Sequence, residues 1–186
     1  MPRLEIEIKL KVADDQQMRD RLGKTGARLL HDREFEDNRV FDFPDQALHQ
    51  RGEMLRIRIL ERGVVLTFKG PGRLEGGKKV REETESTLAV TEAGSLTDIL
   101  QRLGMRQAFR YQKYRTTWLL QGLHVTLDET PIGTFLELEG EPGSIDSVAA
   151  LLGFTPGEYI AASYRDLYLV KQIDTPSAPH EMIFRG

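Results

Sequence analysis

Apolar and charged residues alternate along the first strand that the sequence predicts, residues 4–12. Successive side chains of a strand point to opposite faces, so Glu5, Glu7 and Lys9 share one face and the aliphatic residues between them share the other. The same alternation returns in most of the later strands, with charges of both signs at the alternate positions. One such strand would fit a sheet with one solvent-exposed face, whereas six or more such strands indicate an enclosed, charged cavity.

Glycine, proline and aspartate divide the rest of the chain into short elements. Strands are predicted at residues 28–43 (closing in a turn at 43–45), 54–60, 64–69, 78–88, 109–120, 123–128 and 134–140, and helices at 14–26, 91–103, 144–153 and 161–172. Asp14 and Thr91 are predicted helix caps. About eight mostly antiparallel strands with three or four helices indicate an α+β fold. The domain is predicted to span residues 1–172, with 173–186 as a flexible tail.

The composition excludes several kinds of function. A net charge of −3 argues against a nucleic-acid-binding surface. There is no cysteine, and the four histidines have no metal-ligand spacing, so any metal would be held by carboxylates, as Mg²⁺, Mn²⁺ and Ca²⁺ are. The charged N-terminal residues do not resemble a secretion signal, and no apolar run approaches 18 residues. The expected location is the cytoplasm, with no membrane partner.

The charges in the later predicted strands are grouped by type. They are Arg56, Arg58, Lys69, Arg81, Glu83, Glu85, Lys113, Arg115, Asp128, Glu137 and Glu139. Arginine outweighs lysine in the middle strands, and arginine suits bidentate phosphate binding. A twisted sheet with its charged face in water would show the same alternation. A closed barrel of about eight strands would instead place the charges around a ligand-sized interior, where carboxylates hold cations and guanidinium groups bind a polyanion.

The motif Glu5-x-Glu7-x-Lys9 resembles the signature of the CYTH superfamily, the triphosphate tunnel metalloenzymes. The rest of the ordered set is also similar to this family, from residue 4 to about residue 170: Asp37, Phe41-Asp42, Arg56-x-Arg58, Thr67-x-Lys69, Arg81-x-Glu83-x-Glu85, Lys113-x-Arg115, Leu127-Asp128, Glu137-x-Glu139 and Ser163-Tyr164. The resemblance implies a closed eight-stranded antiparallel β-barrel, with flanking helices, that binds a triphosphate and Mg²⁺ or Mn²⁺.

The same resemblance implies roles for individual residues. The implied metal ligands are Glu5, Glu7 and Glu139, with Glu83, Glu85 and Glu137 in a second acidic cluster. The implied triphosphate-binding residues are Lys9, Arg56, Arg58, Lys69, Arg81, Lys113 and Arg115. The implied catalytic residues are Lys9, Lys113, Arg115 and Asp128, with Asp128 near the reacting phosphate.

Some of these residues also have simpler interpretations. Glu83 or Glu85 could pair with a neighbouring arginine across the sheet, and Glu137 could support a metal ligand without touching the metal. Asp37 could only orient a tunnel arginine, and Tyr164 could pack the last helix.

Two reactions fit this set of residues. The local sequences at residues 37–42, 66–71 and 81–85 resemble those of the class IV adenylyl cyclase branch. This resemblance implies conversion of ATP to cyclic AMP and pyrophosphate. The alternative is an inorganic or thiamine triphosphatase. A non-catalytic polyphosphate- or nucleotide-binding module is a second alternative, disfavoured because the acidic residues at 5, 7, 137 and 139 are all present. Relatives in the cyclase branch suggest a homodimer.

Overall fold

The computed structural model describes residues 2–173 and 181–185 of the chain. Its strands are β1 (Arg3–Val12), β2 (Arg28–Asp42), β3 (Met54–Leu60), β4 (Gly63–Lys69), β5 (Arg73–Glu75), β6 (Lys78–Leu88), β7 (Arg106–Leu120), β8 (Leu123–Thr130), β9 (Gly133–Glu139) and β10 (Glu181–Met182). Its helices are α1 (Asp15–Lys24), α2 (Ala47–Gln50), α3 (Glu92–Arg102), α4 (Pro142–Leu151) and α5 (Tyr164–Ile173), with a 3₁₀ turn η1 (Pro156–Glu158).

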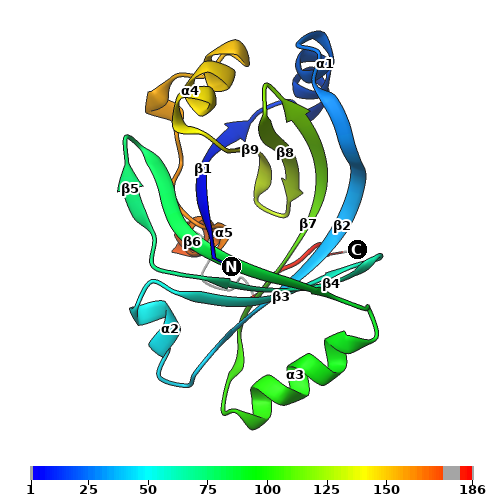
Figure 1. Cartoon of the computed structure of the whole chain (residues 1–186), viewed down its shortest axis with the longest axis vertical. Helices are drawn as coiled ribbons and strands as arrows, with labels where there is room; N and C mark the ends of the chain where they lie inside the picture. Colours follow the sequence, from blue (N-terminus) through cyan, green and yellow to red (C-terminus); the bar gives the residue numbers. More distant parts are fainter. Residues whose placement is uncertain (1, 174–180, 186) are drawn as a thin grey trace.

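Eight of these strands close into an antiparallel barrel (Figure 1). The order around the barrel is β1-β9-β8-β7-β2-β3-β4-β6, and β6 pairs with β1 to complete the ring. The first half of β1 pairs with β6, where Glu5 lies opposite Arg81, and the second half pairs with β9, where Glu7 lies opposite Glu139. The predicted closed barrel with flanking helices is therefore confirmed.

The main apolar clusters lie outside the barrel and under the helices. At one end α1 and α4 cover the outer face of β1, β8 and β9, where Leu10 and Leu136 pack with Leu22 and Val148. At the opposite end α2 and α3 cover β2, β3 and β4 around the fully buried Ile57. Because strand side chains alternate, these apolar contacts leave the charged positions facing the barrel interior.

A third cluster is mostly aromatic and involves the last elements of the chain. Phe109, Tyr111 and Phe135 of the barrel pack against Tyr164 of α5 and against Met182 of β10. Glu181 and Met182 pair in parallel with β7. The C-terminal elements are therefore tied to the barrel wall.

Several predicted elements differ from the observed ones. Asp14 caps α1 as predicted, by accepting the Gln17 N–H, but Thr91 makes no capping hydrogen bond to α3. The strand predicted at 28–43 is observed as β2, one long strand with β-bulges that pairs with both β3 and β7. The unpredicted α2 and β5 lie in segments whose sequence signals only turns.

The prediction of a flexible tail is wrong for part of its range. Glu181 and Met182 form β10, and Met182 is fully buried. Residues 174–180 and 186 lie outside the described residues, so the prediction stands untested there. None of the helices in the described part of the chain has the length and hydropathy needed to span a bilayer.

Candidate active site in the barrel

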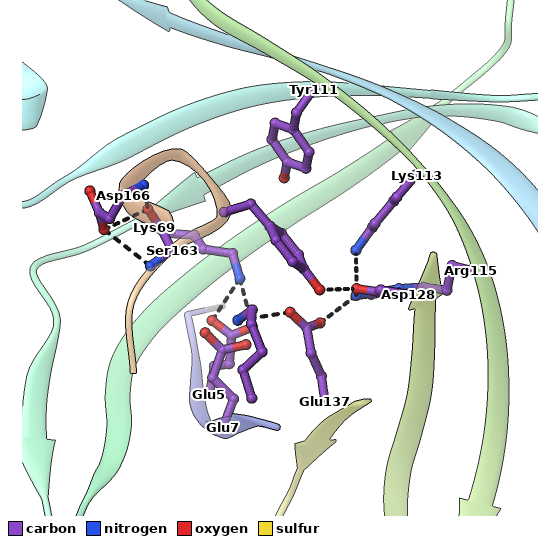
Figure 2. A network of polar contacts seen from close by, with 12 residues as sticks. Glu5, Glu7, Lys69, Tyr111, Lys113, Arg115, Asp128, Glu137, Ser163 and Asp166 are labelled. Carbon is purple, nitrogen blue, oxygen red and sulfur yellow. Dashed lines mark hydrogen bonds and ion pairs between the residues drawn. The ribbon is translucent and has the colours of Figure 1, made fainter. Parts of the chain in front are cut away.

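A cavity of about 760 Å³ lies within the barrel. All eight barrel strands contribute to its lining, together with residues 161–166 before and within α5. Every residue predicted for the site lines this cavity except Asp128, which is fully buried behind its neighbours. The volume is within the range typical of small-molecule sites. Figure 2 shows side chains from several strands converging on one polar network.

One end of the network is formed by acidic residues and two cationic residues. Lys69 Nζ lies 2.6 Å and 2.7 Å from the two carboxylate oxygens of Glu5, and 3.0 Å from Glu83. Arg81 Nε donates to Glu5 at 3.1 Å, and its Nη2 lies 3.6 Å from Glu7. Burial raises the pKa of Glu5, but the charges of Lys69 and Arg81 outweigh it and the pKa is lowered. Glu5 is therefore ionised and neutralised by side chains in this state.

The negative charge of Glu139 is less well compensated by cationic side chains than the charges of the neighbouring carboxylates. Burial and the nearby charges of Glu5 and Glu7 raise its pKa to about 7, although Arg3 contacts its carboxylate. Like charges close together disfavour ionisation. The surroundings of Glu139 therefore carry an excess of negative charge.

The chemistry of these donors fits a hard divalent cation. Among the described residues, no three Asp, Glu or His side chains are already arranged around one point as metal ligands. Carboxylate oxygens are nevertheless the donors that Mg²⁺ and Mn²⁺ prefer. A cation would supply the counter-charge that Glu139 lacks. Glu5, Glu7 and Glu139 could hold it if the Lys69 ammonium group moved away from Glu5.

Asp128 lies at the centre of a second part of the network. Its carboxylate accepts hydrogen bonds from Lys113 Nζ at 2.7 Å, from Arg115 Nε and Nη2 at 2.6 Å each, and from the Tyr164 hydroxyl at 2.7 Å. A carboxylate has about four acceptor positions. Asp128 therefore accepts about as many hydrogen bonds as a carboxylate can, three on Oδ2 and one on Oδ1, and its geometry suits orienting Lys113 and Arg115.

Glu137 lies between Lys9 and Arg115. Lys9 Nζ is 2.9 Å from one carboxylate oxygen, and Arg115 donates to the other. Burial lowers the pKa of Lys9, but Glu137 outweighs it and the pKa is raised to about 12. For Glu137 itself, burial raises the pKa, but Lys9 and Arg115 hold it well below its usual range. In this state Glu137 binds cationic side chains, as Glu83 does.

Glu36 belongs to the same cationic cluster and was not among the predicted site residues. Its carboxylate is buried and lies 3.4 Å from Arg58, 3.6 Å from Lys113 and 3.9 Å from Arg115. Burial alone would raise its pKa, but these three charges outweigh it and the pKa is lowered. The neighbouring Asn38 accepts a hydrogen bond from Arg58 at 3.2 Å. Glu36 is thus an internal counter-ion for three predicted phosphate-binding residues.

Arg56 is held by hydroxyl groups at its two terminal nitrogens. It donates to the Tyr111 hydroxyl at 3.0 Å and to Thr67 Oγ1 at 3.2 Å, and Thr67 donates in turn to Glu85 at 2.8 Å. Glu85 lies 3.7 Å from Arg56 and is partly exposed. The Arg56 Nε is buried and lacks a hydrogen-bond partner among the described residues. This guanidinium group retains a free donor.

Two acidic residues of the resembling motifs lie away from the network. Asp37 binds Arg110 at 2.7 Å and Arg39 at 3.2 Å, both of them outside the set that lines the cavity, so it orients no predicted tunnel arginine. Asp42 accepts hydrogen bonds from three backbone N–H groups at and near α2, which is a structural role.

The sequence analysis missed Lys79, which lines the cavity and forms no ion pair with any described residue. It follows the same alternation as Arg81, so the period of two could have identified it.

Comparison with known proteins places this geometry in a family. The model of the CYTH domain matches residues 3–153. The chain belongs to the CYTH domain family. Enzymes of this superfamily generally act on triphosphate-containing substrates and use divalent metal ions.

Two sequence relatives match most of the chain. A candidate adenylate cyclase of Methanocaldococcus jannaschii is 28% identical over 137 residues, which is 73% of this chain and 76% of that protein. The adenylate cyclase CyaB of Aeromonas hydrophila is 26% identical over 178 residues, which is 89% of this chain and 88% of CyaB.

Two solved structures share the fold. A protein of Vibrio parahaemolyticus described as a candidate adenylate cyclase has a TM-score of 0.79 at 18% identity, over 91% of this chain and 99% of that one. A Hippeastrum protein, HpAC1, has a TM-score of 0.71 at 21% identity, over 92% and 96% of the two chains. The CYTH domain match ends before α5, although Tyr164 of α5 contacts the network.

Proposed function

We propose that this CYTH protein is a metal-dependent enzyme that acts on a triphosphate inside the barrel, and that its reaction is the class IV adenylyl cyclase reaction. The observation that carries the proposal is the convergence on one cavity of lysine and arginine side chains from β1, β3, β4, β6 and β7, beside a group of carboxylates. A polyanion held with a cation satisfies both sets of charges.

The cationic residues bind the phosphate chain. Those assigned to it are Lys9, Arg56, Arg58, Lys69, Arg81, Lys113 and Arg115. Preorganised charges of this kind stabilise the charge that develops on the transferred and leaving phosphates. Asp128 and Glu36 hold Lys113 and Arg115 in place, which makes them positioning residues.

The carboxylates are assigned to the metal. Glu5, Glu7 and Glu139 would hold it, and Glu83, Glu85 and Glu137 would complete the acidic surroundings. When bound, Mg²⁺ or Mn²⁺ would supply Lewis-acid stabilisation of the charge on the phosphates.

In the cyclase reaction the 3′-oxygen of ATP bonds to the α-phosphorus. The bond from the α-phosphorus to the bridging oxygen of the β-phosphate breaks, the electron pair leaves with pyrophosphate, and the 3′-hydroxyl proton is released. The names of the two sequence relatives favour this reaction.

Hydrolysis of a terminal phosphate is the second candidate. HpAC1 of Hippeastrum, which shares this fold, is described as having a dominant triphosphatase activity. In this reaction a water oxygen bonds to the terminal phosphorus and the bond from that phosphorus to the bridging oxygen breaks. The electron pair leaves with the shortened phosphate chain, orthophosphate is formed and one proton is released. One charged barrel can serve either reaction, because the fold does not fix the chemistry.

A product assay distinguishes the candidates. Purified protein with Mg²⁺ or Mn²⁺ is given ATP, inorganic tripolyphosphate or thiamine triphosphate. Cyclic AMP and pyrophosphate from ATP support the cyclase, whereas orthophosphate without cyclic AMP supports the triphosphatase.

If the protein is a non-catalytic binding module, it should turn over none of these substrates. Glu7→Gln is the matching variant, because it should abolish turnover in a metalloenzyme yet preserve or strengthen metal-free tripolyphosphate binding in a pure binder. Full activity of Glu7→Gln would contradict the metal assignment.

A further inference from the structure

Tyr164 contacts three charged residues of the site at once. Its hydroxyl donates to Asp128 at 2.7 Å, and the Nζ atoms of Lys9 and Lys113 lie 4.8 Å and 5.3 Å from its ring centroid. The side chain is buried and lines the cavity. Cation–π contacts of this length are favourable, and more so away from water. A single aromatic residue therefore positions two of the predicted phosphate-binding lysines.

The surroundings of Tyr164 fix its ring. Phe135 packs edge-on at a centroid distance of 5.6 Å, and Tyr111 lies at 6.0 Å. At the start of α5, the side chain of Asp166 accepts hydrogen bonds from the N–H of Ser163 at 3.0 Å and from its hydroxyl at 2.7 Å (Figure 2). These bonds close the first turn of α5. The ring position is therefore set by α5 and by the barrel together.

The position of α5 depends in turn on the end of the chain. The Tyr168 hydroxyl donates to the Glu181 carbonyl at 3.1 Å, next to the fully buried Met182. Before α5, Ile160 and Lys9 exchange backbone hydrogen bonds of 2.8 Å and 3.1 Å. All of these elements lie after the matched CYTH domain, except Lys9.

Accordingly, we propose that Tyr164 is a positioning residue for triphosphate chemistry, and that α5 and β10 are part of the working site although they lie outside the CYTH domain match. This inference rests on the proposed function. The Tyr164 hydroxyl supplies one of the four donors of Asp128, so that Lys113 and Arg115 can share their charge with a phosphate. The ring contacts the ammonium groups of both Lys9 and Lys113.

The hydroxyl remains a donor throughout the working pH range. Burial and the negative charge of Asp128 raise the pKa of Tyr164 well above its ordinary value. It therefore acts through Asp128 and does not serve as a base.

A double-mutant cycle tests this role. Tyr164→Phe keeps the ring and removes the hydroxyl, and Asp128→Asn removes the charge through which the hydroxyl acts. We expect Tyr164→Phe to lower kcat/KM about tenfold, mainly in kcat, because a positioning contact matters most in the transition state. In the Asp128→Asn background the same change should cost less than about twofold. The control is Tyr159→Phe, whose hydroxyl binds Asp146 at 2.9 Å away from the cavity lining and whose loss should leave kcat/KM unchanged.

The outcomes separate this inference from the proposed function. Equal losses in both backgrounds, or a loss below about twofold for Tyr164→Phe alone, would overturn the role of Tyr164. If the wild type turns over no triphosphate, the proposed function fails. The same four-variant cycle is then measured by calorimetry as the Kd for inorganic tripolyphosphate, where coupling supports the inference, and additive effects or no binding overturn it.

Discussion

The Lys69 ammonium group lies 2.6 Å and 2.7 Å from the two carboxylate oxygens of Glu5, and so joins β4 to β1 across the intervening β6. Both side chains are almost completely buried. A predicted phosphate-binding residue is therefore paired with a predicted metal ligand. A cation at Glu5 would displace the lysine, and the displaced ammonium group would be free for a phosphate.

Replacing this lysine should therefore have opposite effects on the two ligands. We expect Lys69→Met to tighten Mn²⁺ binding several-fold, because the competing charge is removed, and to weaken tripolyphosphate binding about tenfold. Isothermal titration calorimetry measures both. Lys24→Met on the surface of α1 is the control. Weaker binding of both ligands would show that Lys69 does not compete with a metal.

The raised pKa of Glu139 makes the metal-free protein pH-sensitive. A folded-state pKa of about 7, above the ordinary value of 4.5, means that the folded state holds this proton more tightly than the unfolded state. Its contribution to stability is complete below pH 4.5 and is lost as the pH rises to about 7, by at most about 3 kcal/mol. Thermal unfolding in a chelator across this range measures it.

Glu139→Gln should remove this part of the pH dependence of the unfolding free energy. It should also make the metal-free protein more stable than the wild type at pH 8. The exposed Glu61→Gln should leave the profile unchanged. An unchanged slope in Glu139→Gln would mean that other groups carry the pH dependence. Saturating Mn²⁺ should also stabilise the wild type more at pH 8 than at pH 5, because the metal competes with the proton.

Glu36 should matter more for stability than for phosphate binding. Glu36→Gln leaves Arg58, Lys113 and Arg115 with one counter-charge fewer, at a cost of about 3 kcal/mol in the free energy of unfolding. Tripolyphosphate can replace the missing charge, so it should raise the Tm of Glu36→Gln by more than it raises the wild-type Tm. A smaller rise in the variant would contradict the role of Glu36 as an internal counter-ion.

The free Nε of Arg56 predicts that a lysine cannot replace this arginine. Arg56→Lys keeps the charge but loses the planar group that contacts Tyr111 and Thr67 and presents a further donor. Tripolyphosphate affinity should fall about tenfold in calorimetry. Arg102→Lys, on the exposed end of α3, should have no effect. Equal affinity for Arg56→Lys would mean that charge alone suffices.

The barrel and most of its lining could be predicted because strand side chains alternate with a period of two. Glu5, Glu7 and Lys9 follow this period without interruption, and the fold confirms the closed barrel that the pattern indicated. The interpretation of each residue as a metal or phosphate contact remains a prediction.

There are physical reasons why the sequence did not predict the contacts of Glu36 and Tyr164. Glu36 lies in a run, residues 32–37, in which charged residues occupy both odd and even positions, so a period of two does not single out the inward-facing carboxylate. Tyr164 was part of the motif Ser163-Tyr164, but its contacts with the site were not predicted, because it lies on a helix and its partners Lys9 and Asp128 come from distant strands. Contacts of this kind depend on how the elements pack, which a local pattern does not encode.

β1 divides its pairing between β6 and β9, and this division has a consequence for how the molecule forms. β1 precedes β9 in the chain by most of the domain, so during synthesis it leaves the ribosome long before its second partner exists. Contacts between distant segments form slowly, since the long intervening loop must be ordered first. Ring closure is therefore expected to come late in folding, and the charged interior remains open to water until then.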